Sequence, residues 1–151
     1  MHGMAPVKKA TLEHTATFQL GTIGAVVAQR FAEKIEPLGL KPKHVGLLTL
    51  LAANPASSQL DMATAMNVAP SLVVRIADQL ESLGAIERTR DPDDRRRQTL
   101  RLTERGRALF AECASITRDL EADLLAGLQI AERKALIAAL RHVAGNLGLA
   151  F

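Results

Sequence analysis

The sequence of 151 residues lacks tryptophan and tyrosine and contains a single cysteine, Cys113. A lone cysteine excludes an internal disulfide and a zinc site built from cysteines. The four phenylalanines are the only aromatic residues, which argues against the stacking surfaces of single-strand nucleic-acid binders. No run of about 18 apolar residues and no secretory signal is recognised, so we expect a cytoplasmic protein. Apolar residues make up 48% and charged residues 23% of the chain, typical of one globular domain.

Positive charge is concentrated in one short segment, although the whole chain carries only +3. Residues 88–107 contain eight arginines and four acidic residues, a net charge of +4, so the remaining residues sum to −1. Arginine suits contacts to phosphates, base edges and narrow minor grooves. Judged by charge alone, a solvent-exposed hairpin held by surface salt bridges is as good an explanation of this segment as contact with a nucleic acid.

The spacing of apolar residues and turn formers predicts six helices and one β-hairpin. We expect helices at about residues 12–36, from 42 to before 54, 58–66, 70–84, from the N-cap Thr103 to a break at Gly127, and through 136–147. Strands at about 85–90 and 98–102 flank the acidic turn 91–94. The arginine-rich segment is therefore a hairpin that directly follows the fourth helix.

The third and fourth helices, joined by a tight turn at Asn67, predict a helix-turn-helix. The fourth helix fits the major groove of B-DNA, where the exposed residues at its start would read base edges. Arg75 is the strongest candidate for a bidentate contact to guanine, and Val74 and Pro70 are candidates for contacts to thymine methyl groups. With the arginine hairpin as a wing against an adjacent minor groove or phosphates, the pattern predicts a winged helix, mainly α with a small β-hairpin.

The first, fifth and sixth helices carry apolar stripes that one helix-turn-helix unit cannot cover. A second copy of the chain would cover them, so we expect a two-fold homodimer that reads a pseudo-palindrome. A compact monomer with these helices folded back as extra core is the alternative. The predicted organisation is a flexible tail (1–10) and a single domain (11–151), with dimerisation helices at 11–39 and 104–151 and a DNA-binding lobe at 40–103.

Five segments carry a family resemblance: Ser58–Ala63, Arg75–Glu81, Leu83–Arg88, the wing Asp91–Arg96 and Leu102–Gly106. In this order they resemble the MarR/SlyA family of bacterial transcription regulators. The resemblance implies a winged-helix homodimer with Arg95 in the minor groove and Arg75 as the main base-reading arginine. The predicted DNA-binding residues are Ser58, Gln59, Ala69, Pro70, Ser71, Val74, Arg75, Arg95, Arg96 and Arg97.

The resemblance also implies how the wing and the regulator work. Asp94 would hold the wing through ion pairs, and Asp91 is the other predicted wing-stabilising residue. Such proteins usually repress a nearby operon or their own gene. Many release DNA when a small effector, often a phenolic or lipophilic anion, binds between the dimer helices and the lobe.

The start of the recognition helix departs from the family. Residues 69–72 read Ala-Pro-Ser-Leu, where the family often has Asp-Arg-Ser-Thr, so two polar base readers are absent. Asn67 stands where the family usually has a turn glycine. A winged-helix module for protein interaction, without specific DNA reading, is therefore the main rival hypothesis.

An enzyme is disfavoured because no catalytic constellation and no glycine-rich phosphate loop is found. The four histidines lack metal-ligand spacing, and the turn 91–94 lacks the glycine and closing glutamate of a calcium loop. No metal or cofactor is expected. Cys113 lies on the apolar stripe of the fifth helix and is expected to be buried and unreactive.

Overall fold

The computed structural model describes residues 3–4, 6 and 11–149, so most of the predicted flexible tail lies outside the described residues. Contacts divide the chain into two units, residues 1–116 and 117–151, and each is described by itself. The division falls within the fifth helix, whereas the sequence predicted the lobe to end at 103.

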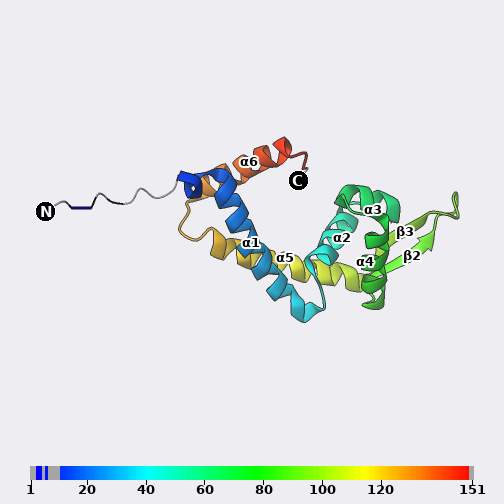
Figure 1. Ribbon diagram of the computed structural model, residues 1–151. Coiled ribbons are helices and arrows are strands. Elements are labelled where there is room, and N and C mark those ends of the chain that lie inside the picture. The colour runs from blue at the N-terminus through cyan, green and yellow to red at the C-terminus, as the bar shows by residue number, and fades with distance from the viewer. Residues whose placement is uncertain (1–2, 5, 7–10, 150–151) are drawn as a thin grey trace. The chain divides into compact units, whose positions relative to one another are not determined.

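The six predicted helices and both hairpin strands are present (Figure 1). The helices are α1 (Ala16–Ile35), α2 (Pro42–Ala53), α3 (Gln59–Met66), α4 (Pro70–Ser82), α5 (Glu104–Leu124) and α6 (Ile130–Asn146). Two 3-10 turns, Thr11–His14 and Glu36–Leu38, flank α1. The first helix begins later than predicted because the Thr15 hydroxyl caps it, accepting a hydrogen bond from the Phe18 N–H at 3.2 Å.

The sheet of the described chain has three antiparallel strands in the order β1-β3-β2, not only the two of the predicted hairpin. Strand β2 (Ile86–Arg90) pairs with β3 (Gln98–Leu102), and β1 (Ser57–Ser58) adds to the other edge of β3. A strand of two residues is too short to show an alternating pattern, which is why the sequence did not reveal β1.

The helix-turn-helix forms as predicted. Asn67 takes the left-handed conformation (φ 53°, ψ 49°) that ends α3, and the proline ring of Pro70 occupies the first turn of α4. His44 links α2 to α4, because its Nδ1 accepts from the Lys41 N–H at 2.8 Å and its Nε2 lies 2.6 Å from Gln79 Oε1. A histidine with these two partners donates from Nε2.

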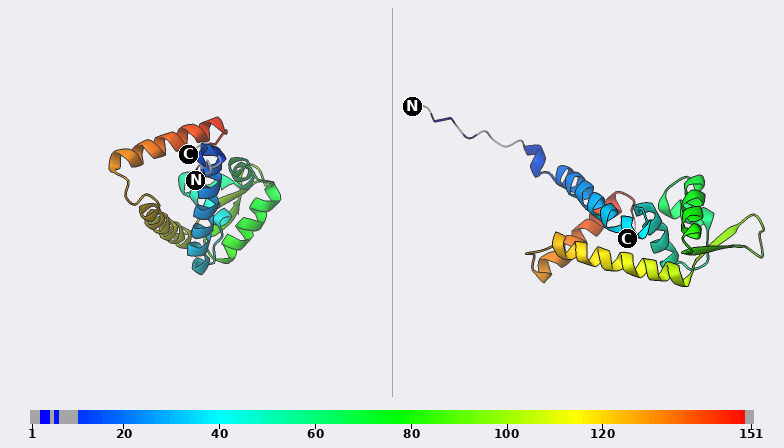
Figure 2. Two further views of the ribbon diagram at one scale, coloured as in Figure 1. Left: turned by 60° about the vertical axis from the view of Figure 1, so that its left-hand side comes forward. Right: turned by 90° about the horizontal axis from the view of Figure 1, so that it is seen from below.

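The core of the first unit joins α2, α3, α4, the sheet and the start of α5. Its fully buried large side chains are Ile35, Leu47, Leu48, Leu51, Val73, Leu80, Leu100 and Cys113. Leu109 and Cys113 belong to this core, so the first half of α5 is part of the lobe. The hairpin projects beyond α3 and α4 (Figure 2). Searched over its described residues, the chain has no helix both long enough and apolar enough to cross a membrane.

Candidate nucleic-acid interface

The first turns of α4 present the predicted base-reading residues to solvent. Its buried face is formed by Val73, Ile76, Ala77 and Leu80. On the other side, Ala69, Pro70, Ser71, Val74 and Arg75 are all exposed. The Arg75 side chain forms no hydrogen bond or ion pair within the described chain. An exposed helix start that carries one free guanidinium can enter a major groove.

The tip of the hairpin is built by backbone hydrogen bonds. The Asp91 N–H donates to the Arg97 carbonyl oxygen, and the Arg97 N–H donates to the Asp94 carbonyl oxygen, both at 2.9 Å. The two predicted wing-stabilising aspartates cap this turn with their side chains. Asp91 Oδ1 accepts from the Asp93 N–H at 2.9 Å, and Asp94 Oδ1 accepts from the Arg96 N–H at 3.0 Å.

The expectation that Asp94 holds the wing through ion pairs is wrong for the described chain. In the described chain, the ion pairs of the hairpin are made by Arg88 and Arg97, and Asp94 takes part in none of them. Short aspartate side chains bond readily to backbone N–H groups two residues on, which is the geometry of this turn.

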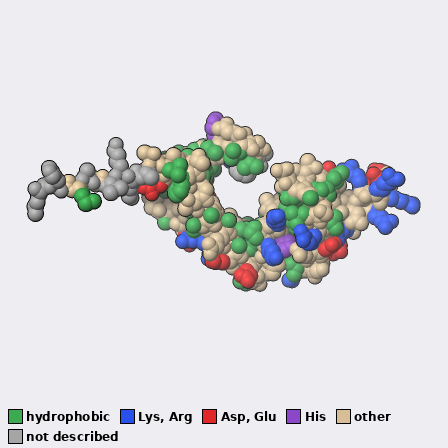
Figure 3. Space-filling view, in the orientation of Figure 1, with side chains coloured by type: hydrophobic (Ala, Val, Ile, Leu, Met, Phe, Trp, Pro, Cys, Tyr) green, Lys and Arg blue, Asp and Glu red, His purple; other side chains and the backbone are tan. Residues whose placement is uncertain are grey.

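Arginine side chains gather at the far end of the hairpin (Figure 3). Arg95 and Arg96 lie there, both exposed and without a side-chain partner among the residues that the structure describes. Arg90 and Arg101, on the strands, are likewise exposed and unpartnered in that part of the chain. These four cations are therefore free to meet phosphates or a minor groove.

Ser58 and Arg97 were predicted to bind DNA, but they bind each other. Ser58 is 7% exposed. Its hydroxyl caps α3 by accepting from the Asp61 N–H at 3.0 Å, and it also accepts from Arg97 Nη2 at 3.1 Å. Arg97 Nη2 also lies 3.2 Å from Asp61 Oδ2. Ser58 is thus a capping residue, and Arg97 fastens the hairpin to the start of α3.

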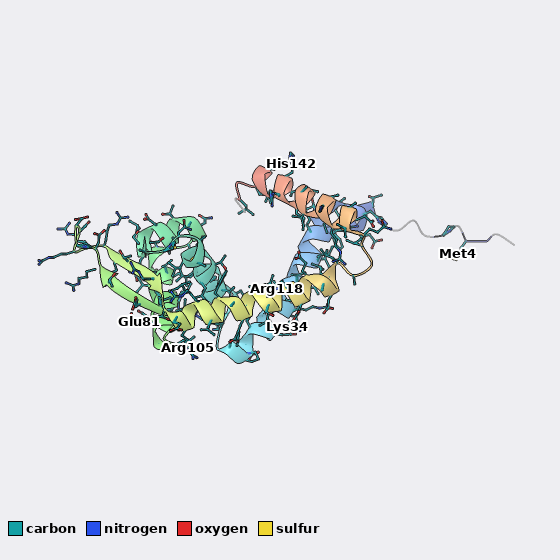
Figure 4. All side chains as sticks on the ribbon, turned by 180° about the vertical axis from the view of Figure 1, so that it is seen from behind. Met4, Lys34, Glu81, Arg105, Arg118 and His142 are labelled. Carbon is teal, nitrogen blue, oxygen red and sulfur yellow. The ribbon has the colours of Figure 1, made fainter. Side chains whose placement is uncertain are left out.

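Gln59 was also predicted to contact DNA, and its side-chain oxygen instead accepts from Arg88 Nε at 2.9 Å. The sequence did not reveal the role of Arg88, because nothing in it distinguishes Arg88 from the other arginines of residues 88–107. Its side chain is 15% exposed and makes further bonds to α4. Figure 4 shows Glu81, one of these partners, and Arg105 near the base of the hairpin.

The arginines of residues 88–107 therefore divide into two equal groups. Arg88 and Arg97 bond to α3 or α4, while Arg105 Nε donates to the Leu83 carbonyl oxygen at 2.8 Å and Arg107 Nη1 to that of Leu102 at 3.2 Å. The remaining four are the free ones named above. Four of the eight arginines thus have guanidinium groups without a partner in the described chain, and the other four bond within it.

Cys113 is 1% exposed. Burial raises the pKa of its thiol, and the neighbouring Glu112 carboxylate raises the pKa further. A thiol held protonated in this way is a poor nucleophile. In the described chain, no group of three or more His, Cys, Asp or Glu side chains is placed to hold a metal ion.

Two helices carry apolar side chains that their own units leave exposed. On α1 these are Phe18, Leu20, Ile23 and Val26, each between 40% and 51% exposed. Only the end of α1 is buried, where Ile35 enters the core. On α6, Ile130, Leu136, Ile137 and Leu140 are exposed as well. Exposed apolar faces of this kind mark interaction surfaces.

A helix-turn-helix followed by an antiparallel hairpin with free arginines at its tip defines the first unit as a winged-helix lobe. The model of the MarR family matches residues 40–97, which run from just after the 3-10 turn that follows α1 to the tip of the hairpin, the last residue before β3.

Relatives and solved structures agree with this match. A putative transcriptional regulatory protein for the hcr operon of Thauera aromatica is 37% identical over 105 residues, covering 70% of this chain and 63% of that protein. The chain thus spans slightly less than two thirds of the Thauera protein. An uncharacterized HTH-type transcriptional regulator of Bacillus subtilis (strain 168), YdgJ, is 30% identical over 130 residues, covering 86% of this chain and 77% of that protein.

The transcriptional repressor CouR has been solved bound to a 23-mer DNA duplex. That structure aligns with a TM-score of 0.81 and 31% identity, covering 93% of this chain and 99% of the other. The chain belongs to the MarR family, which confirms the resemblance found in the sequence. It is a winged helix-turn-helix transcriptional regulator of that family.

Proposed function

We propose that this protein is a homodimeric repressor that binds a pseudo-palindromic operator in duplex DNA and releases it when a small effector binds. The observation that carries the proposal is the arrangement of two free cationic elements on one lobe. Arg75 stands on the exposed start of α4, and Arg95 and Arg96 stand at the tip of the adjacent hairpin.

The two elements suit two different features of a duplex. A helix fits the major groove, where an arginine makes its best contact to guanine. A hairpin tip with free guanidinium groups fits the narrow minor groove or the phosphates beside it. Ala69, Pro70, Ser71, Val74, Arg75, Arg95 and Arg96 are therefore the proposed DNA-contacting residues, and they retain seven of the ten predicted from sequence.

The exposed apolar faces support assembly as a dimer. The side chains of α1 and of α6 that stay exposed in a single chain are large and aliphatic or aromatic. A second copy would bury them, and two-fold symmetry would place two recognition helices about 34–36 Å apart, one turn of DNA. Residues 11–39 and 104–151 are the proposed dimerisation helices, the latter sharing the first half of α5 with the lobe.

The remaining parts of the proposal follow from the family. The relatives named above are transcriptional regulators, so we propose no enzymatic activity and a cytoplasmic location. Many family members respond to phenolic or lipophilic anions, and this is the effector class we propose to screen. The rival function is a winged-helix module for protein interaction, motivated by Ala69 and Pro70 in place of polar base readers.

DNA footprinting on the promoter next to the gene tests the proposal. We expect a protected site with two-fold symmetry. In mobility-shift titrations the protein should bind a duplex with this site more tightly than a scrambled duplex of the same length. Addition of candidate anions should release the protein from this site. Equal affinity for the promoter and the scrambled duplex would favour the interaction module instead.

A further inference from the structure

Arg88 of β2 is the most highly connected side chain of the lobe. Its Nε donates to Gln59 Oε1 in the first turn of α3 at 2.9 Å. Its Nη2 donates to the Val74 carbonyl oxygen of α4 at 3.0 Å. Its Nη1 lies 2.7 Å from Asp78 Oδ1 and 3.4 Å from Glu81 Oε1, also on α4. One guanidinium thus joins the hairpin to both helices of the helix-turn-helix.

The α4 partners of Arg88 share one face of the helix. Positions 74, 78 and 81 are separated by four and three residues, and side chains with this spacing lie above one another. The bonds therefore follow α4 over about two turns, since each turn takes 3.6 residues. Contacts at three levels of a helix restrain both its rotation and its shift along its axis.

The restrained segment is the one proposed above to read DNA. Val74 offers its backbone carbonyl to Arg88 while its side chain is 40% exposed, and the next residue is Arg75. Hydrogen bonds to base edges weaken steeply away from their best distance and angle. Contacts of the wing to phosphates tolerate displacement far better, because charge attraction is less directional.

Resting on the function proposed above, we infer that Arg88 is a positioning residue that sets sequence specificity without touching DNA. Its charge is matched by Asp78 and Glu81, and its side chain is 15% exposed. It aligns the base-reading start of α4 with α3 and the wing. Specific binding depends on this alignment, and non-specific binding does not.

Arg88→Lys tests the inference because lysine keeps the positive charge but lacks the planar guanidinium group, which bonds to four groups at once. Relative to the unmodified protein, affinity for the footprinted operator should fall by about tenfold or more, whereas affinity for a scrambled duplex should stay within about twofold. The salt dependence of binding should be unchanged, since no cation is lost. Arg118→Lys is the control, because Arg118 is an exposed arginine of α5, outside the hairpin, without a partner in the described chain, and it should keep the operator preference.

Asp78→Asn provides a second test that does not depend on the stability of the Arg88 variant. The Asp78 side chain is 61% exposed, so its loss leaves the core intact. Removing a negative charge near DNA should raise affinity for the scrambled duplex, while the loosened α4 should lower the ratio of operator to scrambled affinity. A purely electrostatic role for Asp78 would raise both affinities equally and keep the ratio.

The outcomes distinguish a failure of the positioning role of Arg88 from a failure of the proposed function. Full operator preference in both Arg88→Lys and Asp78→Asn would overturn the positioning role while leaving the regulator intact. An equal loss on both duplexes in Arg88→Lys would instead show that Arg88 supports DNA binding in general rather than sequence preference, and would overturn the role too. If the unmodified protein shows no operator preference, the proposed function itself fails.

Discussion

Gly106, in the first turn of α5, lies directly against the backbone of Ala85, between α4 and β2. A Cβ atom on Gly106 would overlap the Ala85 carbonyl oxygen and come within 2.9 Å of the carbonyl carbon. The same oxygen accepts a hydrogen bond from the Thr103 N–H at 3.0 Å. Thr103 Oγ1 in turn caps α5 by accepting from the Gly106 N–H at 3.0 Å. The absence of a side chain at 106 therefore lets α5 start against the turn that leads into the wing.

Gly106→Ala should destabilise the protein by about 1–3 kcal/mol, the usual cost of adding a methyl group where packing leaves no room. Gly46→Ala is the matched control, because a Cβ there meets only Met66 Cε at 3.6 Å, an ordinary contact. That substitution should be neutral or should stabilise α2 by about 0.5–1 kcal/mol. Urea unfolding of both variants at one protein concentration measures the difference. Equal midpoints for the two would show that Ala85 gives way freely.

Arg75→Ala should relax sequence preference more than it lowers general affinity for DNA. The guanidinium is exposed on the start of α4, where a bidentate contact to guanine is worth about 1–3 kcal/mol of discrimination. Titration of the operator, single-base variants of it and a scrambled duplex measures the loss. Equal losses on every duplex would assign Arg75 to the phosphates instead.

Arg95→Ala should weaken binding to all duplexes and flatten its salt dependence. Removing one cation that meets a phosphate lowers the slope of log affinity against log salt by about 0.9. Arg118→Ala, on the second half of α5, removes the same charge from outside the hairpin and serves as control. Affinities measured at several salt concentrations give the slopes. A slope for Arg95→Ala that matches the unmodified protein would show that the wing tip stays off the DNA.

Ile23→Glu should convert the dimer to a monomer. Ile23 is 51% exposed in the middle of the apolar side chains of α1, and a carboxylate there would be buried without a partner in the dimer. Ala28→Glu is the control. At 3.6 residues per turn, position 28 lies on the side of α1 away from Ile23, so this substitution should leave the dimer intact. Analytical ultracentrifugation should report twice 16.2 kDa for the control and 16.2 kDa for Ile23→Glu. A monomeric unmodified protein at micromolar concentration would remove the two-fold operator from the proposal.

Cys113 should react slowly with a thiol reagent such as Ellman's reagent in the folded protein at neutral pH. The thiolate is the reactive form, and the raised pKa of Cys113 keeps the thiol protonated over a wider range of pH. Raising the pH should speed the reaction, and unfolding in urea should speed it further by removing the burial. Equal rates in folded and unfolded protein would contradict the buried position of this residue.

Much of the lobe is predictable because its signals are local. Thr103 caps the helix that follows it, Asn67 takes the left-handed turn, and the hairpin strands follow an alternating pattern. Each of these features depends on residues only a few positions apart. The short strand β1 was not predicted, because it forms only by pairing with β3, which places Ser57 opposite Leu100, far along the chain.

The sequence by itself determined the class of fold, the place of the wing and the presence of an arginine-rich segment beside a recognition helix. Only the tertiary structure decided which of those arginines are free. Arg88 and Gln59 are 29 positions apart, and Arg97 and Ser58 are 39 positions apart, yet each pair is hydrogen-bonded. The number of charged residues can be counted in the sequence. The partner that each of them bonds to depends on which residues the fold brings together. Four arginines of the positive segment are therefore free for the proposed DNA contacts, and the other four bond within the chain.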